Sequence, residues 1–79
     1  MQIDLEADLN REDDEGRNWA LLRDARDART IRPGVVLRAG TPRFWSWVRI
    51  VVVDPDGQVH FQQISAEEAE RSRRLTPME

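Results

Sequence analysis

The stretch from Phe44 to Ile64 reads FWSWVRIVVVDPDGQVHFQQI. β-branched and aromatic residues dominate both of its arms, which is typical of strands. Between the arms lies DPDG, where Pro55 has the φ that the second position of a tight turn needs and Gly57 tolerates positive φ. The pattern predicts a β-hairpin closed by a type I turn with a glycine bulge.

This turn sets a register for the hairpin and sorts its side chains onto two faces. The predicted pairs are Asp54 with Gln58, Val53 with Val59, Val51 with Phe61, and Val48 with Ile64. One face then carries Trp45, Trp47, Arg49, Val51, Val53, Val59, Phe61 and Gln63, and the other carries Phe44, Ser46, Val48, Ile50, Val52, His60, Gln62 and Ile64. Both faces of the first arm are apolar near its middle, so we expect that arm to be central. The second arm is more polar and is expected to be an exposed edge.

Three further elements are predicted around the hairpin. Residues 35–39 form a strand that extends the hairpin into an antiparallel meander over 35–64. Asn18 can cap a helix over 19–28, whose buried stripe contains Leu21, Leu22 and Ala25. Ser65 and Glu68 form a capping box, which predicts a short helix over 66–75.

Residues 1–16 form an acidic arm. Apolar and acidic residues alternate over residues 3–9, which indicates an edge strand, although a frayed terminus is an equal alternative. Residues 10–16 are predicted to be an acidic loop that precedes the helix. The spacing fails the calcium-loop pattern, because Gly16 falls at the ninth position from Asp8 instead of the sixth.

Length and composition predict one small domain over residues 1–79. The chain has no cysteine, so its core depends on three Trp, two Phe and the aliphatic residues, or on a partner chain. We find no signal-peptide pattern and no apolar run long enough to cross a bilayer, so we expect a cytoplasmic protein without membrane contact.

Together these elements predict an α+β, β-rich fold. A small antiparallel meander, closed in part by the N-terminal strand, would have one helix before it and a short helix after it. The order and spacing of the predicted strands and turns resemble those of SH3-like barrels at the level of architecture. No stretch matches a family motif, so the resemblance implies no functional residues.

Charge is segregated along the chain. Residues 1–16 hold seven carboxylates against one arginine, a net charge of −6, and residues 17–49 hold eight arginines against two aspartates, a net charge of +6. All twelve basic residues are arginine, which a GC-rich coding bias explains more simply than selection for bidentate partners. Either the acidic arm lies along the basic segment, or one or both of them are presented to a partner.

Nothing in the sequence indicates an enzyme or a bound cofactor. His60 is the sole histidine, and neither Ser46 nor Ser65 lies in a nucleophile-elbow context. One histidine without cysteine also argues against a transition-metal site.

We therefore expect a non-enzymatic interaction or regulatory module that docks on another protein. Its candidate binding residues are Asp13, Asp14, Glu15, Trp47, Arg49, Arg43 and Arg38. The alternative is a nucleic-acid-binding barrel with an Arg/Trp face, where bases would stack on exposed tryptophans. That alternative requires Trp45 or Trp47 to be exposed, whereas their predicted place beside Phe61 favours the core. Homodimerisation is a further alternative, because a short chain can complete its core with a second copy.

Overall fold

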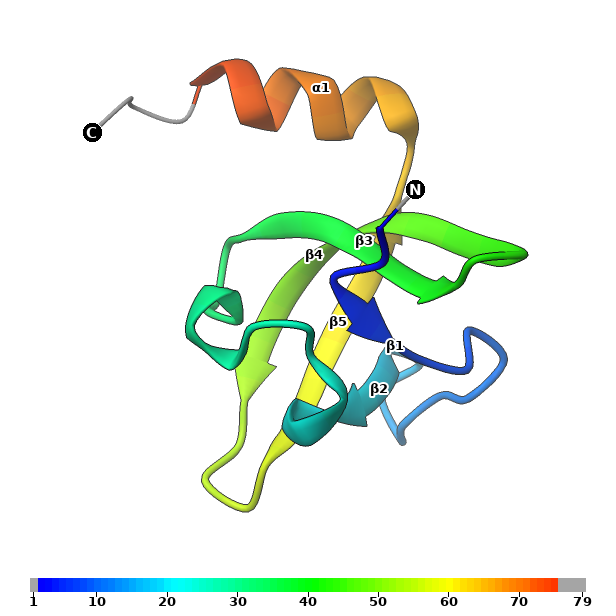
Figure 1. The fold of residues 1–79 in the computed structure, drawn as a ribbon, viewed down its shortest axis with the longest axis vertical. Coiled ribbons are helices and arrows are strands. Elements are labelled where there is room, and N and C mark those ends of the chain that lie inside the picture. Colours follow the sequence, from blue (N-terminus) through cyan, green and yellow to red (C-terminus); the bar gives the residue numbers. More distant parts are fainter. Residues whose placement is uncertain (1, 76–79) are drawn as a thin grey trace.

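The fold is a curled five-stranded sheet, a half-barrel, with one short α-helix across it (Figure 1). The computed structural model describes residues 2–75, with side chains for residues 2–72. The strands are β1 (Leu5–Glu6), β2 (Asn18–Leu21), β3 (Val36–Thr41), β4 (Phe44–Val53) and β5 (Gln58–Ile64), and the helix is α1 (Ala66–Leu75). Their order in the sheet is β1-β3-β4-β5-β2, which is consistent with the predicted small β-rich barrel.

The antiparallel meander of β3, β4 and β5 is present as predicted. At the tip of the β4–β5 hairpin, the Gly57 N–H donates to the Asp54 carbonyl at 2.9 Å and the Asp54 N–H donates to the Gln58 carbonyl at 2.8 Å. Gly57 has a φ of 92°, which a glycine bulge requires. The predicted turn and the Val53–Val59 pair are therefore confirmed.

Beyond these pairs the predicted register is wrong by one residue. A β-bulge between Ile50 and Val52 shifts the pairing, so that Phe61 lies opposite Ile50 instead of Val51. Because side chains alternate along a strand, the extra residue moves the side chains of β4 that precede it to the opposite face of the sheet from the one predicted. Val48 and Ile50 thus share the core with Val59 and Phe61, while Trp45, Trp47 and Arg49 lie on the outer face.

The predicted helix over 19–28 is also wrong. Residues 18–21 form β2, which pairs with β5, and two short 3₁₀ turns follow at Leu22–Asp24 and Ala28–Thr30. The Asn18 side chain does not cap a helix, because its Nδ2 donates to the carbonyls of Leu9 and Arg11. A helix of ten residues is marginal on its own, and pairing with the free edge of β5 replaces it. For the same reason β5 is not the exposed edge that its polar residues suggested.

The two edges of the sheet approach each other at β1 and the segment after β2. β1 is parallel to β3 at one edge, and Leu5 also bridges to Ala25. The Arg26 N–H donates to the Asp4 carbonyl at 2.8 Å. These contacts curl the sheet around a core formed by Leu5, Leu9, Ala20, Ile31, Leu37, Ala39, Val48, Ile50, Val59 and Phe61.

Helix α1 lies over the outer face of β3 and β4 (Figure 1). Ser65 caps it as predicted, since its Oγ accepts a hydrogen bond from the Glu68 N–H at 3.0 Å. Ala69 is buried, with 1% of its surface exposed, so the helix packs on this face through Ala69.

Candidate functional site

An arginine and two tryptophans stack on the outer face of β3 and β4. Arg38 lies opposite Trp47, and its guanidinium carbon is 4.8 Å from the centre of that indole and 5.5 Å from that of Trp45. The two indoles meet edge to face with centroids 5.8 Å apart. Such contacts are attractive because the ring faces are electron-rich. Both tryptophans are half-buried, so neither the predicted core position nor full exposure holds.

Gly40 lies next to this stack, at a close approach of β3 and β4. It lies opposite Trp45 with a φ of 131°, and a Cβ there would be 2.4 Å from the Phe44 carbonyl oxygen. No other residue fits so close an approach of two strands. Glycine at this position thus lets the β3 and β4 backbones approach closely next to the stack.

A hollow of about 250 Å³ opens beside the stack. It is lined by Asp4, Val36, Leu37, Arg38 and Trp47. Asp4 is held in place by two hydrogen bonds to the main chain of Arg38. Its Oδ2 accepts from the Arg38 N–H at 3.0 Å, and its own N–H donates to the Arg38 carbonyl. The hollow therefore has a fixed carboxylate and a guanidinium among its walls.

The other two predicted arginines lie apart from this hollow. Arg49 Nη1 donates to Glu68 Oε2 at 2.6 Å and its Nη2 donates to Ser72 Oγ at 2.5 Å, so Arg49 ties β4 to α1. Arg43 lies exposed in the turn between β3 and β4. The predicted Arg/Trp face is thus divided, with Arg49 engaged by the helix.

The predicted acidic residues lie in a loop before β2. Asp13 Oδ1 accepts from the main-chain N–H groups of Glu15 at 2.8 Å and Arg17 at 2.9 Å. Glu15 forms an ion pair with Arg17 at 2.7 Å, whereas Asp14 is exposed. Asp13 therefore organises the loop, and Asp14 and Glu15 are the two exposed residues of these three.

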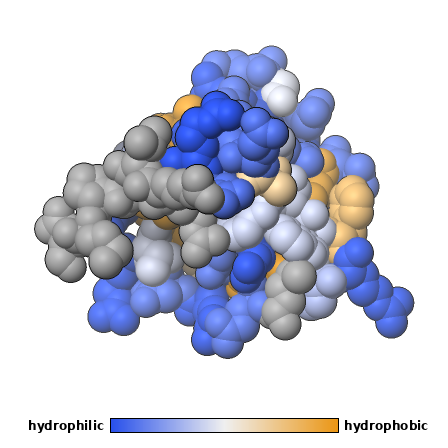
Figure 2. All heavy atoms as spheres, turned by 90° about the horizontal axis from the view of Figure 1, so that it is seen from above, coloured by the Kyte–Doolittle hydropathy of each residue, from blue (hydrophilic) through white to orange (hydrophobic). Residues whose placement is uncertain are grey.

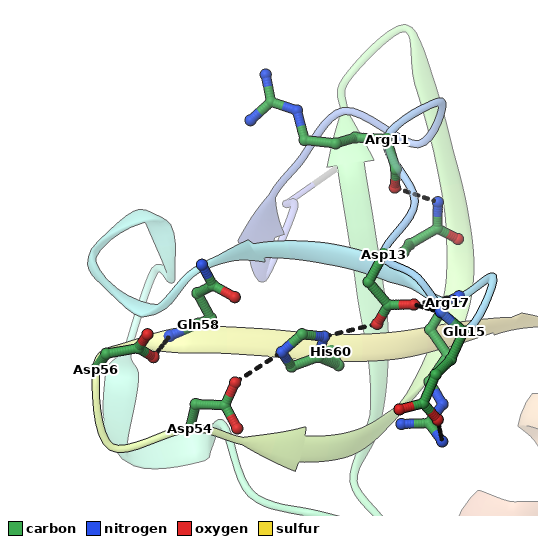
Figure 3. A network of polar contacts seen from close by, with 9 residues as sticks. Arg11, Asp13, Glu15, Arg17, Asp54, Asp56, Gln58 and His60 are labelled. Carbon is green, nitrogen blue, oxygen red and sulfur yellow. Dashed lines mark hydrogen bonds and ion pairs between the residues drawn. The ribbon is translucent and has the colours of Figure 1, made fainter.

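His60 connects this loop to the hairpin (Figure 3). Its Nδ1 is 2.8 Å from Asp13 Oδ2 and its Nε2 is 2.8 Å from Asp54 Oδ2. A neutral imidazole has one N–H and could satisfy one carboxylate, so the geometry fits the doubly protonated ring. With both nitrogens engaged, this imidazolium has no lone pair to act as a general base.

These contacts shift two pKa values. Burial by itself lowers the pKa of His60, but the hydrogen bonds and charges of Asp54 and Asp13 outweigh it, so the pKa is raised above 6.5. The Arg17 N–H lowers the pKa of Asp13 below 3.8, burial opposes this, and His60 and the Glu15 N–H lower it further. The two shifts favour the charged pair.

A second and larger hollow lies between the acidic arm and the turn that joins β3 to β4. Its volume is about 340 Å³, and it is lined by Glu6, Ala7, Asp8, Leu9, Arg11, Asp24, Thr41 and Phe44. Phe44 is 60% exposed, and it is the one large hydrophobic side chain so exposed among the described residues. The Thr41 hydroxyl accepts from the Phe44 N–H at 3.1 Å, which fixes the start of β4.

The sequence did not single out this second hollow. The sequence places Phe44 on a strand face, and Asp24 lies within the range predicted for a helix that does not form. The segregation of charge was a signal, because among the described residues the two oppositely charged segments share a single ion pair, Glu15–Arg17. Most carboxylates of the acidic arm are therefore left without a cationic partner within the described part of the chain.

Comparison with protein-family models, with curated proteins and with solved structures gives no match. Within the described residues, no three His, Asp or Glu side chains are grouped so that they could hold a metal ion. α1, the single α-helix of the described chain, is too short and too polar to span a membrane. The site must therefore be interpreted from its own chemistry.

Proposed function

We propose that this protein is a non-enzymatic interaction module that docks a basic segment of another protein. The exposure of Phe44 at the mouth of the acidic hollow carries the proposal. The partner segment would contribute Lys or Arg to the carboxylates and one apolar side chain to the phenyl ring.

Phe44 has the features of an anchor for binding. Aromatic side chains bury a large area on binding at low cost in conformational entropy, so they are enriched among the residues that dominate interface energies. A single exposed apolar residue is common on protein surfaces. Here the ring borders a hollow that also contains Ala7 and Leu9, so an inserted aliphatic side chain would meet apolar walls.

The charge around Phe44 selects the partner. Glu6, Asp8 and Asp24 line the hollow, and Arg11 is the single basic residue among the described residues that line it. The guanidinium of Arg11 lies over the Trp19 ring, 4.8 Å from its centre, and so is drawn towards β2. A positive segment would gain electrostatic attraction here, most of it in the rate of association and in specificity.

Peptide selection tests this function. The immobilised full chain is used to select from a phage-displayed library of random peptides, and enriched peptides are synthesised and titrated by calorimetry. We expect enriched peptides to combine Lys or Arg with an apolar residue. Phe44→Ser should weaken their binding by about 30-fold, as expected for an interface anchor.

Two further variants complete the design. Glu6→Gln with Asp8→Asn should weaken binding by a smaller factor and flatten its dependence on salt. Gln62→Ala, an exposed change on β5, serves as the control and should leave the affinity unchanged. Selected peptides that lack basic residues, or that bind Phe44→Ser as tightly as the wild type, would disprove the proposal.

Nucleic-acid binding is the second candidate, and the stack of Arg38 on Trp47 and Trp45 favours it, since bases stack on such rings. It is the weaker candidate because Arg49 is paired with Glu68 and the chain carries a net charge of −3. A saturable, salt-sensitive change in tryptophan fluorescence on adding a mixed single-stranded oligonucleotide would favour it over protein docking.

We also propose three further properties of the protein from its sequence. These are an SH3-like arrangement of the partly open barrel, a cytoplasmic location and self-association into a homodimer. Sedimentation over a range of protein concentrations would test the last of these.

A further inference from the structure

The guanidinium of Arg38 has a buried N–H donor without an acceptor among the described residues. In the described part of the chain, the Arg38 Nε is buried without a hydrogen-bond partner and the guanidinium forms no ion pair. Buried polar groups in native proteins nearly always have a partner, and one that lacks it calls for an explanation. Contact with the faces of Trp45 and Trp47 stabilises the charge but satisfies none of the N–H donors.

The hollow of about 250 Å³ lies directly beside this guanidinium. Val36, Leu37 and Trp47 also line it, but the surface that faces the hollow is mostly polar. A carboxylate that enters could accept charge-assisted hydrogen bonds from Arg38, which are stronger than hydrogen bonds between neutral groups.

We propose that this hollow binds one carboxylate group from an acidic segment of a partner protein. The planar guanidinium presents donors that match the two oxygens of a carboxylate, whereas a lysine could not make the same paired contact. The residues that line it are all different from those of the Phe44 hollow, so the site goes beyond the proposed function.

Asp4 favours a carboxylate over a phosphate. Its own carboxylate lies in the wall of the hollow, held by the Arg38 N–H. Bringing a second anion close to it costs free energy, and that cost is greater for a phosphate, which carries up to two negative charges near neutral pH. The size of the hollow also suits a single small group better than a nucleotide.

The Arg38 side chain provides a direct readout. Because its Nε is buried, its N–H exchanges slowly with water and should give a resolved cross-peak in a proton–nitrogen correlation spectrum. The full chain is titrated at constant ionic strength with acetate, with a doubly blocked glutamate, with N-acetylalanine, and with inorganic phosphate. The blocked glutamate offers a side-chain carboxylate, and N-acetylalanine offers a chain-terminal one.

We expect at least one of the three carboxylates to shift the Arg38 Nε–H peak saturably, with phosphate binding more weakly. The Kd should be in the millimolar range or weaker, because one small group makes few contacts. Arg38→Lys should weaken carboxylate binding by about tenfold or more, followed through the Trp47 indole N–H. Arg32→Lys, at an exposed residue, is the matched control and should leave binding unchanged.

Asp4→Asn tests whether the negative charge of Asp4 makes the hollow prefer a carboxylate to a phosphate. The amide oxygen can still accept from the Arg38 N–H while the charge is removed, so phosphate binding should tighten by a larger factor than carboxylate binding. A wild-type Arg38 peak that does not move with any carboxylate would overturn the proposal without need of a variant. Tighter binding of phosphate than of every carboxylate in the wild type would also overturn it and would favour a nucleic-acid partner.

Discussion

At the scale of single residues, His60 joins the acidic loop, β5 and the end of β4 through hydrogen bonds that need both of its ring protons. Its raised pKa means that protonation is favoured by folding. The stability it contributes is therefore complete below pH 6.5, the ordinary value in the unfolded chain, and is lost as the pH rises through the folded pKa. The lowered pKa of Asp13 acts in the opposite direction, since its contribution is lost as the pH falls below 3.8.

We expect His60→Gln to lower the free energy of unfolding by about 1–3 kcal/mol at pH 6, because glutamine can donate to one carboxylate at most. The difference from the wild type should shrink as the pH rises through the folded pKa of His60. Urea unfolding followed by tryptophan fluorescence, at several pH values between 5 and about 9, measures this. A gap between variant and wild type that stays constant over this range would refute the dependence on His60 protonation, and Gln62→Ala on the same strand is the control.

At the scale of elements, α1 depends on one local contact and on the face that it covers. The Ser65 hydroxyl caps its first turn, while Arg49 bonds to Glu68 and Ser72 from β4. The sequence predicted the range of this helix because a capping box is a signal within four residues. It did not indicate that Glu68 would turn to Arg49 from another element.

Ser65→Ala should loosen α1 without disturbing the sheet. Loss of a helix cap costs about 1 kcal/mol, which corresponds to about a fivefold fall in the protection of the α1 amides against hydrogen exchange. Ser65→Asp retains a side-chain acceptor at this position and should keep the protection. An equal loss in both variants, or a loss that extends to β4 amides, would argue against this role for the cap.

At the scale of the whole molecule, the shortest strand completes the core. Leu5 in β1 has none of its surface exposed, and β1 brings the two edges of the sheet together through Ala39 and Ala25. A domain of this size has a small free energy of unfolding, so the loss of one well-packed side chain should destabilise the whole fold.

Leu5→Ala should therefore lower the free energy of unfolding by about 2–5 kcal/mol, through lost burial and the cavity that remains. Ile3→Ala, in the same arm but half-buried, should cost clearly less. Chemical denaturation of the two variants in parallel provides the comparison. Similar costs for both would show that β1 is not an integral part of the core.

By itself, the sequence determined those parts of the protein whose signals lie within a few residues. The DPDG turn, the β-branched arms of the hairpin and the Ser65 cap each combine favourable backbone geometry with a local hydrogen bond, and each was predictable for that reason. The segregation of charge along the chain also identified the acidic arm as a surface of interest.

Only the tertiary structure decided the rest, because it depends on contacts between distant segments. The free edge of β5 draws residues 18–21 into a strand where local propensity indicated a helix, and the bulge at Val51, marked by no Gly or Pro, moves the tryptophans away from Phe61. His60 and Asp13 are 47 positions apart, and the Phe44 hollow brings together β1, β4 and Asp24. Such contacts form when apolar faces are buried together, and the spacing of residues along the chain does not specify them.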